Sequence, residues 1–289
     1  MIDFFKPISS AIKLIKELYG VRREHIDSFR KEAQRIIDAF EAHDIPPNEV
    51  MRLLPEGLLD DPSDLGSAQS LKKHLAKVSP WTQSTLRLNP AWLKGRSSVP
   101  HKIVSSYKHL TALVEFLQAT ELESADMSRF TVYVFKQDVQ PIELSSGPMV
   151  IILAETFAEI DEVELTRFYY LSERLEFGHL HCLLNLMHVM AFAHHYGIRV
   201  RGCVMKPSYL LRLERGEGFI PALRRGEIAK GWYPEDMLWT GLTGDPAWKE
   251  RIQADLDARL RREGFGWLAS EIESERVRLA SSGQGVVTS

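Results

Sequence analysis

Histidine residues recur at regular intervals in the most apolar segment of this 289-residue chain. His181, His188 and His195 are seven residues apart, a spacing that returns to nearly the same side of a helix after every two turns. Imidazole and thiol groups bind metals, exchange protons near neutral pH and react with oxidants. Seven helical residues span about 10 Å, which is too far for two of these histidines to share one ion. We therefore predict no metal site and interpret the segment as the place where a small-molecule or redox effector acts. The candidate residues are His181, Cys182, His188 and Cys203.

Motifs of the common enzyme classes are absent from the sequence. It has no GxGxxG loop, no Walker-type GxxxxGK loop, no GxSxG turn, and no HExxH or CxxC pair. Two cysteines cannot form a disulfide framework. We therefore predict no cofactor and no enzymatic activity. A metal-dependent enzyme built on the histidine-rich helix is the alternative from the enzyme class.

The net charge of −3 conceals an asymmetry along the chain. Residues 1–110 contain 17 Lys and Arg against 13 Asp and Glu, whereas the remainder contains 19 against 26. Between Asp64 and Glu115 there is no acidic residue. A surface that meets a polyanion has this composition, because each cation near a phosphate releases counterions and a carboxylate there would repel the backbone. The alternatives are a solvated basic face and a patch that meets the acidic half of the same chain. The basic residues of this run are Lys72, Lys73, Lys77, Arg87, Lys94, Arg96, Lys102 and Lys108.

Apolar spacing indicates which elements position these groups. Residues 1–40 carry apolar side chains at steps of three and four, which predicts a helical arm. This arm is either a coiled-coil dimerisation segment or, as we favour, two helices that turn near Gly20 and fold against the neighbouring domain. Residues 41–120 are predicted to form a helix-turn-helix-like module and a connecting helix. The helices expected there cover 47–54, 68–78, 80–88, a short turn opened by Asn89 and Pro90, and 102–120.

After Ser128 the apolar period changes from helical to alternating. Residues 127–225 are predicted to form an α+β sensor or dimerisation domain, residues 228–280 C-terminal helices and residues 281–289 a flexible tail. The fold class is therefore α+β, mostly α. The strands expected are 130–136, 140–144, 148–153, 198–205 and 209–217, with helices over 159–177 and 179–197.

The hydropathy pattern predicts a protein without a membrane partner. No stretch of eighteen apolar residues occurs, and the first residues, MIDFFKPISS, lack the basic head and apolar run of a secretory signal. We expect a cytoplasmic protein.

Residues 35–96 resemble the Xre/Cro (lambda-repressor-like) helix-turn-helix domains. The first helix corresponds to RIIDAFEAH, the turn to Asp44-Ile45-Pro46, the second helix to residues 47–52, and the closing signature to residues 88–95, LNPAWLKG. The resemblance implies a module that places polar side chains against base edges while Lys and Arg hold phosphates. The segment SAQSLKKHLAK has this content. The expected DNA-binding residues are Gln69, Ser70, Lys72, Lys73, Lys77, Arg87, Lys94 and Arg96.

These observations together predict a bacterial-type DNA-binding transcriptional regulator with a C-terminal sensing or pairing domain. Its partners are expected to be double-stranded DNA and a second copy of the chain, because such modules read operators as pairs of half-sites about 34 Å apart. The alternative is a non-catalytic adaptor protein whose degenerate helix-turn-helix module binds protein.

Overall fold

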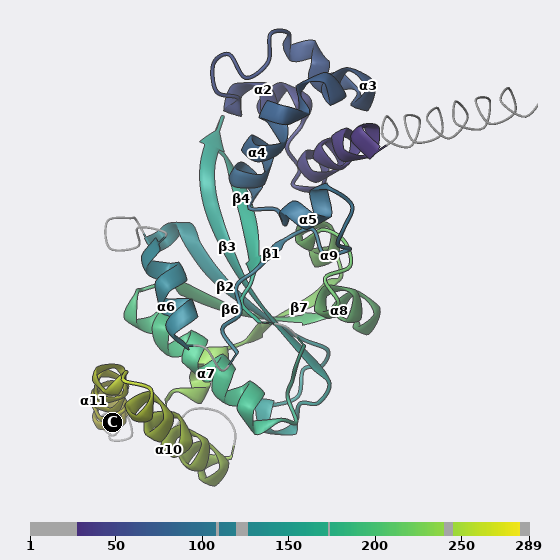
Figure 1. Cartoon of the computed structure of the whole chain (residues 1–289). Coiled ribbons are helices and arrows are strands. Elements are labelled where there is room, and N and C mark those ends of the chain that lie inside the picture. Colours follow the sequence, from purple (N-terminus) through teal and green to yellow (C-terminus); the bar gives the residue numbers. More distant parts are fainter. Residues whose placement is uncertain (1–27, 108–109, 120–126, 173, 240–244, 284–289) are drawn as a thin grey trace, which may run out of the picture. The chain divides into compact units, whose positions relative to one another are not determined.

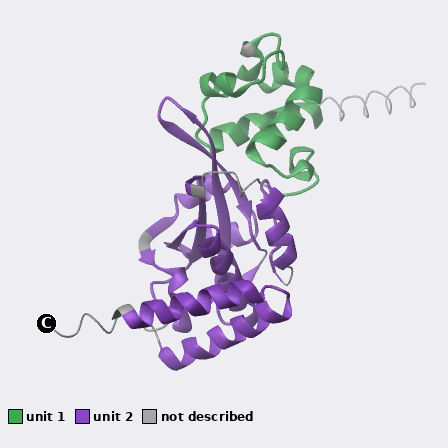
Figure 2. Ribbon diagram, turned by 90° about the vertical axis from the view of Figure 1, so that its left-hand side faces the viewer, with its two compact units in different colours: residues 1–98 green, residues 99–289 purple. Residues whose placement is uncertain are grey.

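The computed structural model describes residues 28–107, 110–119, 127–172, 174–239 and 245–283 (Figure 1). The chain divides into two compact units, residues 1–98 and 99–289, here called the first and second units (Figure 2). The predicted fold class is confirmed, since the structure is mixed α+β and mostly helical. No helix within the described ranges is long and apolar enough to cross a membrane.

The described part of the first unit consists of short helices joined by capped turns. Asn89 Oδ1 accepts a hydrogen bond from the Ala91 N–H at 2.9 Å, and Pro90 occupies the first turn, so the predicted start of this helix is confirmed. Pro47 likewise opens its helix, as predicted. The elements are residues 28–42, α2 (Pro47–Leu53), η1 (Pro62–Gly66), α3 (Ala68–Leu71), η2 (Lys72–His74), α4 (Leu75–Leu86) and α5 (Pro90–Leu93).

The predicted division into helices 68–78 and 80–88 is wrong, because α4 runs through Pro80. Val78 and Thr82 are buried on either side of this proline, so packing holds the helix across the missing N–H. The helix ends instead at Arg87, which adopts the left-handed conformation (φ 51°).

The helix over residues 28–42 packs into the core of the first unit. Ala33, Ile36 and Phe40 are buried, and the Phe40 ring stacks on Trp81 with the ring centroids 5.5 Å apart. This part of the predicted arm therefore packs against α4 of its own unit, whereas the predicted turn near Gly20 stays a prediction. Residues 1–27 lie outside the described part of the chain.

The second unit is built on a mixed sheet in the order β1-β4-β3-β2-β6-β7, with β5 beside β3. The pairs β1/β4 and β2/β6 are parallel, and the other pairs are antiparallel. The predicted strands 130–136 and 198–205 are confirmed. The strands are β1 (Lys102–Ile103), β2 (Phe130–Lys136), β3 (Pro148–Ile160), β4 (Val163–Tyr170), β5 (Leu175–Glu176), β6 (Arg199–Met205) and β7 (Glu227–Trp232).

Helices cover both faces of this sheet (Figure 1). Val134 and Ile151 point to the face covered by α6, α7, α10 and α11, whereas Phe135 and Ile152 point to the face covered by α8 and α9. This alternation follows from the two-residue period of a strand. The helices are α6 (Leu110–Ala119), α7 (Leu180–His195), α8 (Pro207–Glu214), α9 (Ile220–Arg224), α10 (Pro246–Arg262) and α11 (Gly266–Gly283), with 3-10 turns η3 (Met127–Arg129), η4 (Ile142–Leu144) and η5 (Pro234–Met237).

The histidine-rich helix forms as predicted and ends where expected. Gly197 adopts φ 68°, and the Ile198 N–H bonds the Ala193 carbonyl at 2.8 Å, which is a Schellman cap.

The predicted helix over 159–177 is wrong, because this region is a β-hairpin. Asp161 and Glu162 both have positive φ (49° and 65°), the conformation of a two-residue type I′ turn. Strands β3 and β4 pair on either side, with Ile160 opposite Val163. The acidic spacing that suggested a helix belongs to this turn and to the exposed start of β4.

Four smaller predictions also fail. The region 102–120, predicted as one helix, begins with the strand β1, and its described helix α6 covers Leu110–Ala119. Within 140–144, residues 142–144 form the 3-10 turn η4 instead of a strand. Residues 209–214 of the predicted strand 209–217 are helical, because Pro207 opens α8, and this helix buries Leu210 and Leu213, three residues apart. Strand β7 begins the segment expected to be wholly helical after 228.

Candidate functional site

Some of the predicted DNA-binding residues of the first unit lie together on one exposed helical side, and the others lie on separate elements. Ser67 caps α3 by accepting the Ser70 N–H at 3.2 Å, and Leu71 and Val78 are buried. The opposite side of the α3–η2–α4 segment therefore faces solvent. Gln69, Lys73 and Lys77, four residues apart, are exposed on it, and we call these three residues the basic helix face.

The remaining predicted DNA-binding residues of the first unit are placed differently. Ser70 and Lys72 are half-buried, and the Ser70 hydroxyl already bonds that of Ser67 at 2.5 Å. Arg87 is half-buried at the end of α4, whereas Lys94 and Arg96 are exposed after α5. The structure thus gathers three of the eight residues on one helical side and distributes the others over separate elements.

The candidate sensing residues of the second unit do not form one site. His181 is exposed at the start of α7, Cys182 is buried next to it, and Cys203 is buried on β6. Burial and the nearby Glu227 raise the pKa of Cys203 to about 11. No group of three metal-binding side chains exists among the residues that the structure describes.

His188 is the most perturbed of these candidates. It is 1% exposed in the middle of α7, and neither ring nitrogen has a hydrogen-bond partner among the described residues. Burial, with a smaller effect from the positive charge of Arg259, lowers its pKa to about 3. The imidazole is therefore neutral over the physiological pH range.

A buried ionic cluster spans β3 and β4. Arg167 donates two hydrogen bonds of 2.7 Å to the Glu155 carboxylate, and the Tyr169 hydroxyl donates a third of 2.7 Å. Burial opposes ionisation of Glu155, but these donors outweigh it and lower the carboxyl pKa. Because the carboxylate is fully occupied by protein donors, we interpret the cluster as structural.

A cavity of about 270 Å³ in the second unit contains the site that sequence reasoning missed. It lies between the loop after β2, the end of β7, η5 and the first turn of α10. Its charged lining residues are Lys136, Glu143, Asp236 and Lys249, and its large apolar and aromatic lining residues include Ile142, Trp232, Tyr233 and Met237.

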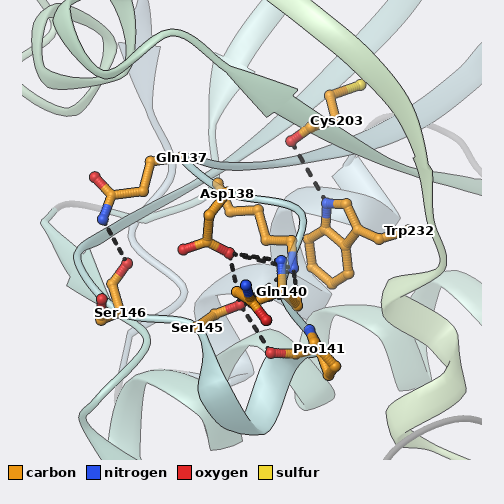
Figure 3. Close-up of polar contacts among 9 residues, drawn as sticks. Gln137, Asp138, Gln140, Pro141, Ser145, Ser146, Cys203 and Trp232 are labelled. Carbon is orange, nitrogen blue, oxygen red and sulfur yellow. Dashed lines mark hydrogen bonds and ion pairs between the residues drawn. The ribbon is translucent and has the colours of Figure 1, made fainter.

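Lys136 at the end of β2 is buried and saturated with protein contacts. Its ammonium donates to the Gln140 carbonyl and to Ser145 Oγ (3.1 Å), lies 3.9 Å from Asp138 Oδ1, and is 4.8 Å from the centre of the Trp232 ring. Figure 3 shows these partners gathered beside the indole. Burial lowers the pKa of Lys136, and Asp138 acts in the opposite direction. The lysine holds the loop after β2 against β7.

Lys249 in the first turn of α10 is equally buried but unsatisfied. Its side chain is 4% exposed, and Nζ has no hydrogen-bond partner among the described residues. Burial lowers its pKa, opposed by the charges of Asp236 and Glu143. Glu143 Oε1 itself accepts the Asp245 N–H at 3.0 Å, which ties η4 to the start of α10. The cavity therefore contains an amine donor for which the described residues supply no acceptor.

Comparisons with known proteins give no further constraint. No family model, no curated protein and no solved structure matches the chain.

Proposed function

We propose that the protein is a DNA-binding regulator whose first unit binds double-stranded DNA through the basic helix face. The observation that carries this proposal is the exposure of Gln69, Lys73 and Lys77 on one side of a helical segment, within a stretch that has no acidic residue from Leu65 to Ser98. The nearest preceding acid, Asp64, bonds His74 at 2.8 Å. Lysines on such a face neutralise phosphates without competition from carboxylates.

A second observation supports a helix-turn-helix arrangement. The helix over residues 28–42 is followed by a four-residue turn and then by α2. Asp44 in this turn has φ 57°, and Ile45 is buried. Short turns of three or four residues join the two helices of DNA-binding helix-turn-helix motifs. The adaptor alternative would use the same basic face to bind an acidic protein.

The test reverses the charge of the two lysines of the basic helix face and of the adjacent, half-buried Lys72. The variant Lys72→Glu, Lys73→Glu, Lys77→Glu should retain the fold, since lysine and glutamate have similar helix propensity and none of the three side chains is buried. Fluorescence anisotropy with a duplex of about 25 base pairs measures binding at several salt concentrations. The parent affinity should fall with salt at a slope of about −0.9 per phosphate contact, and the variant should lose binding.

The matched control reverses three exposed cations of the second unit. Lys206→Glu, Arg251→Glu, Arg262→Glu changes the net charge equally, and it should bind DNA more tightly than the charge-reversed basic face at every salt concentration. Equal binding by parent and basic-face variant contradicts the proposal. Failure of the parent to bind any duplex at about 50 mM salt also contradicts it and leaves the adaptor alternative.

We also propose that the regulator acts as a homodimer. Ala33, Ile36 and Phe40 are already buried within the first unit, so the contact between copies must use other residues, such as those before 28 or the helices α10 and α11. Light scattering at micromolar concentration, with and without DNA, tests this. A monomeric mass in both conditions contradicts it.

A further inference from the structure

The ammonium of Lys249, which has no hydrogen-bond partner among the described residues, indicates which chemical group would bind in the cavity. Moving a charged amine out of water is strongly unfavourable unless oxygen acceptors replace its hydration. Lys136, on the same cavity, obtains such acceptors from the Gln140 carbonyl and Ser145 Oγ. Lys249 is shielded from water, with only 4% of its surface exposed, but its ammonium has no oxygen acceptor among the described residues. A molecule that enters the cavity with acceptor oxygens would supply them.

The charges on the cavity wall restrict what that molecule is. Lys136 and Lys249 are balanced by Glu143 and Asp236, so the formal charges of the lining residues cancel. A simple anion would meet Lys249 but would be repelled by the two carboxylates, and a simple cation would have the reverse difficulty. A ligand that carries both signs satisfies both sets of charges.

The apolar lining and the size of the cavity restrict the rest of the ligand. Trp232, Ile142 and Met237 form apolar walls beside the charged groups. Pockets for drug-sized molecules have volumes of roughly 300–1,000 Å³, so a cavity of about 270 Å³ suits a smaller compound.

We propose that this cavity binds a small zwitterion, an amino acid with an apolar side chain. Lys249 receives the carboxylate, Asp236 and Glu143 face the ammonium group, and the side chain lies against Trp232. The inference does not depend on DNA binding, because it rests on residues of the second unit alone.

Isothermal titration of the full-length protein with L-leucine and L-phenylalanine tests the proposal. Binding with a Kd on the order of 1 mM or tighter is expected for at least one of them. Two analogues separate the charges: 3-phenylpropionate lacks the ammonium group and 2-phenylethylamine lacks the carboxylate. Each should bind at least about 10-fold more weakly than L-phenylalanine if that amino acid binds. Equal binding by 3-phenylpropionate would overturn the assignment of a zwitterion, and no binding by either amino acid would overturn the site.

Variants assign the binding to named side chains. Lys249→Met should reduce affinity about 10- to 100-fold, and Asp236→Asn about 10-fold, whereas Lys206→Met, at an exposed position of the same unit, should leave it unchanged. The thermal melt of ligand-free Lys249→Met distinguishes a ligand site from a structural contact. Because the variant removes a buried ammonium that has no hydrogen-bond partner among the described residues, its melting temperature should equal or exceed that of the parent. A large decrease, or unchanged affinity, would contradict the proposal.

Discussion

His188 should make the stability of the second unit depend on pH. Its pKa is about 3 in the folded protein against an ordinary value of 6.5. Because the folded state keeps the ring neutral while the unfolded chain takes up a proton, the stabilisation is complete above pH 6.5 and is lost as the pH falls toward 3. The loss is about 1.4 kcal/mol per pH unit, so lowering the pH from 7.5 to 5 should reduce the unfolding free energy by about 2 kcal/mol.

The variant His188→Leu isolates this effect. Urea unfolding of parent and variant at the two pH values gives the contribution of His188 to the pH dependence of the unfolding free energy. This comparison is needed because His43 of the first unit is also buried, with a pKa of about 4, and makes stability depend on pH in the same direction. Between pH 7.5 and 5, the unfolding free energy of the variant should fall by about 2 kcal/mol less than that of the parent. It should also be no less stable at pH 7.5, because it removes a buried ring whose nitrogens lack partners among the described residues. An unchanged pH dependence would refute the reasoning, and a loss of stability at pH 7.5 would reveal a partner for the imidazole.

Three further outcomes follow from the second unit. Glu155→Gln should lower the unfolding free energy by about 3 kcal/mol, measured by urea titration, because it leaves the Arg167 charge uncompensated in the interior. Gly202→Ala should lower the unfolding free energy by about 3 kcal/mol in the same assay, since an added Cβ would lie 2.3 Å from the Trp232 carbonyl oxygen. A urea unfolding curve equal to that of the parent would contradict this packing. In a Cys182→Ser background, Cys203 should resist a thiol reagent at pH 8 until urea is added, because a pKa of about 11 leaves about 0.1% thiolate and the side chain is 3% exposed.

The sequence predicts elements well where local chemistry and tertiary packing agree. Strand 130–136 and helix 179–197 are examples, since each has one clear apolar period and its own boundary signal. The sequence does not predict the hairpin at Asp161 and Glu162, because its type I′ turn uses two acidic residues without the usual glycine or asparagine. The strand predicted over 209–217 is wrong because its apolar residues suit a strand, while Pro207 begins the helix α8.

The cavity could not be predicted because its groups converge only in the tertiary structure. Lys136 follows a run of strand residues. Lys249 stands between Trp248 and Glu250, in a segment whose pattern of charged and apolar residues is that of an exposed helix. Neither position carries a motif. The basic helix face is the opposite case, because its residues are neighbours in sequence and their exposure follows from the buried Leu71 and Val78.

The pairing of β2 with β6 has a consequence during synthesis. Thr131 pairs with Arg199 from a point about 70 residues later in the chain, while the other side of β2 pairs with the adjacent β3. At ~5–20 residues per second, a ribosome needs ~4–14 s to supply that missing neighbour. During this interval β2 presents an open edge whose side chains Val132 and Val134 are apolar. The nascent chain therefore passes through a stage in which it is prone to pair with other chains, and truncated products that end before β6 should accumulate as aggregates.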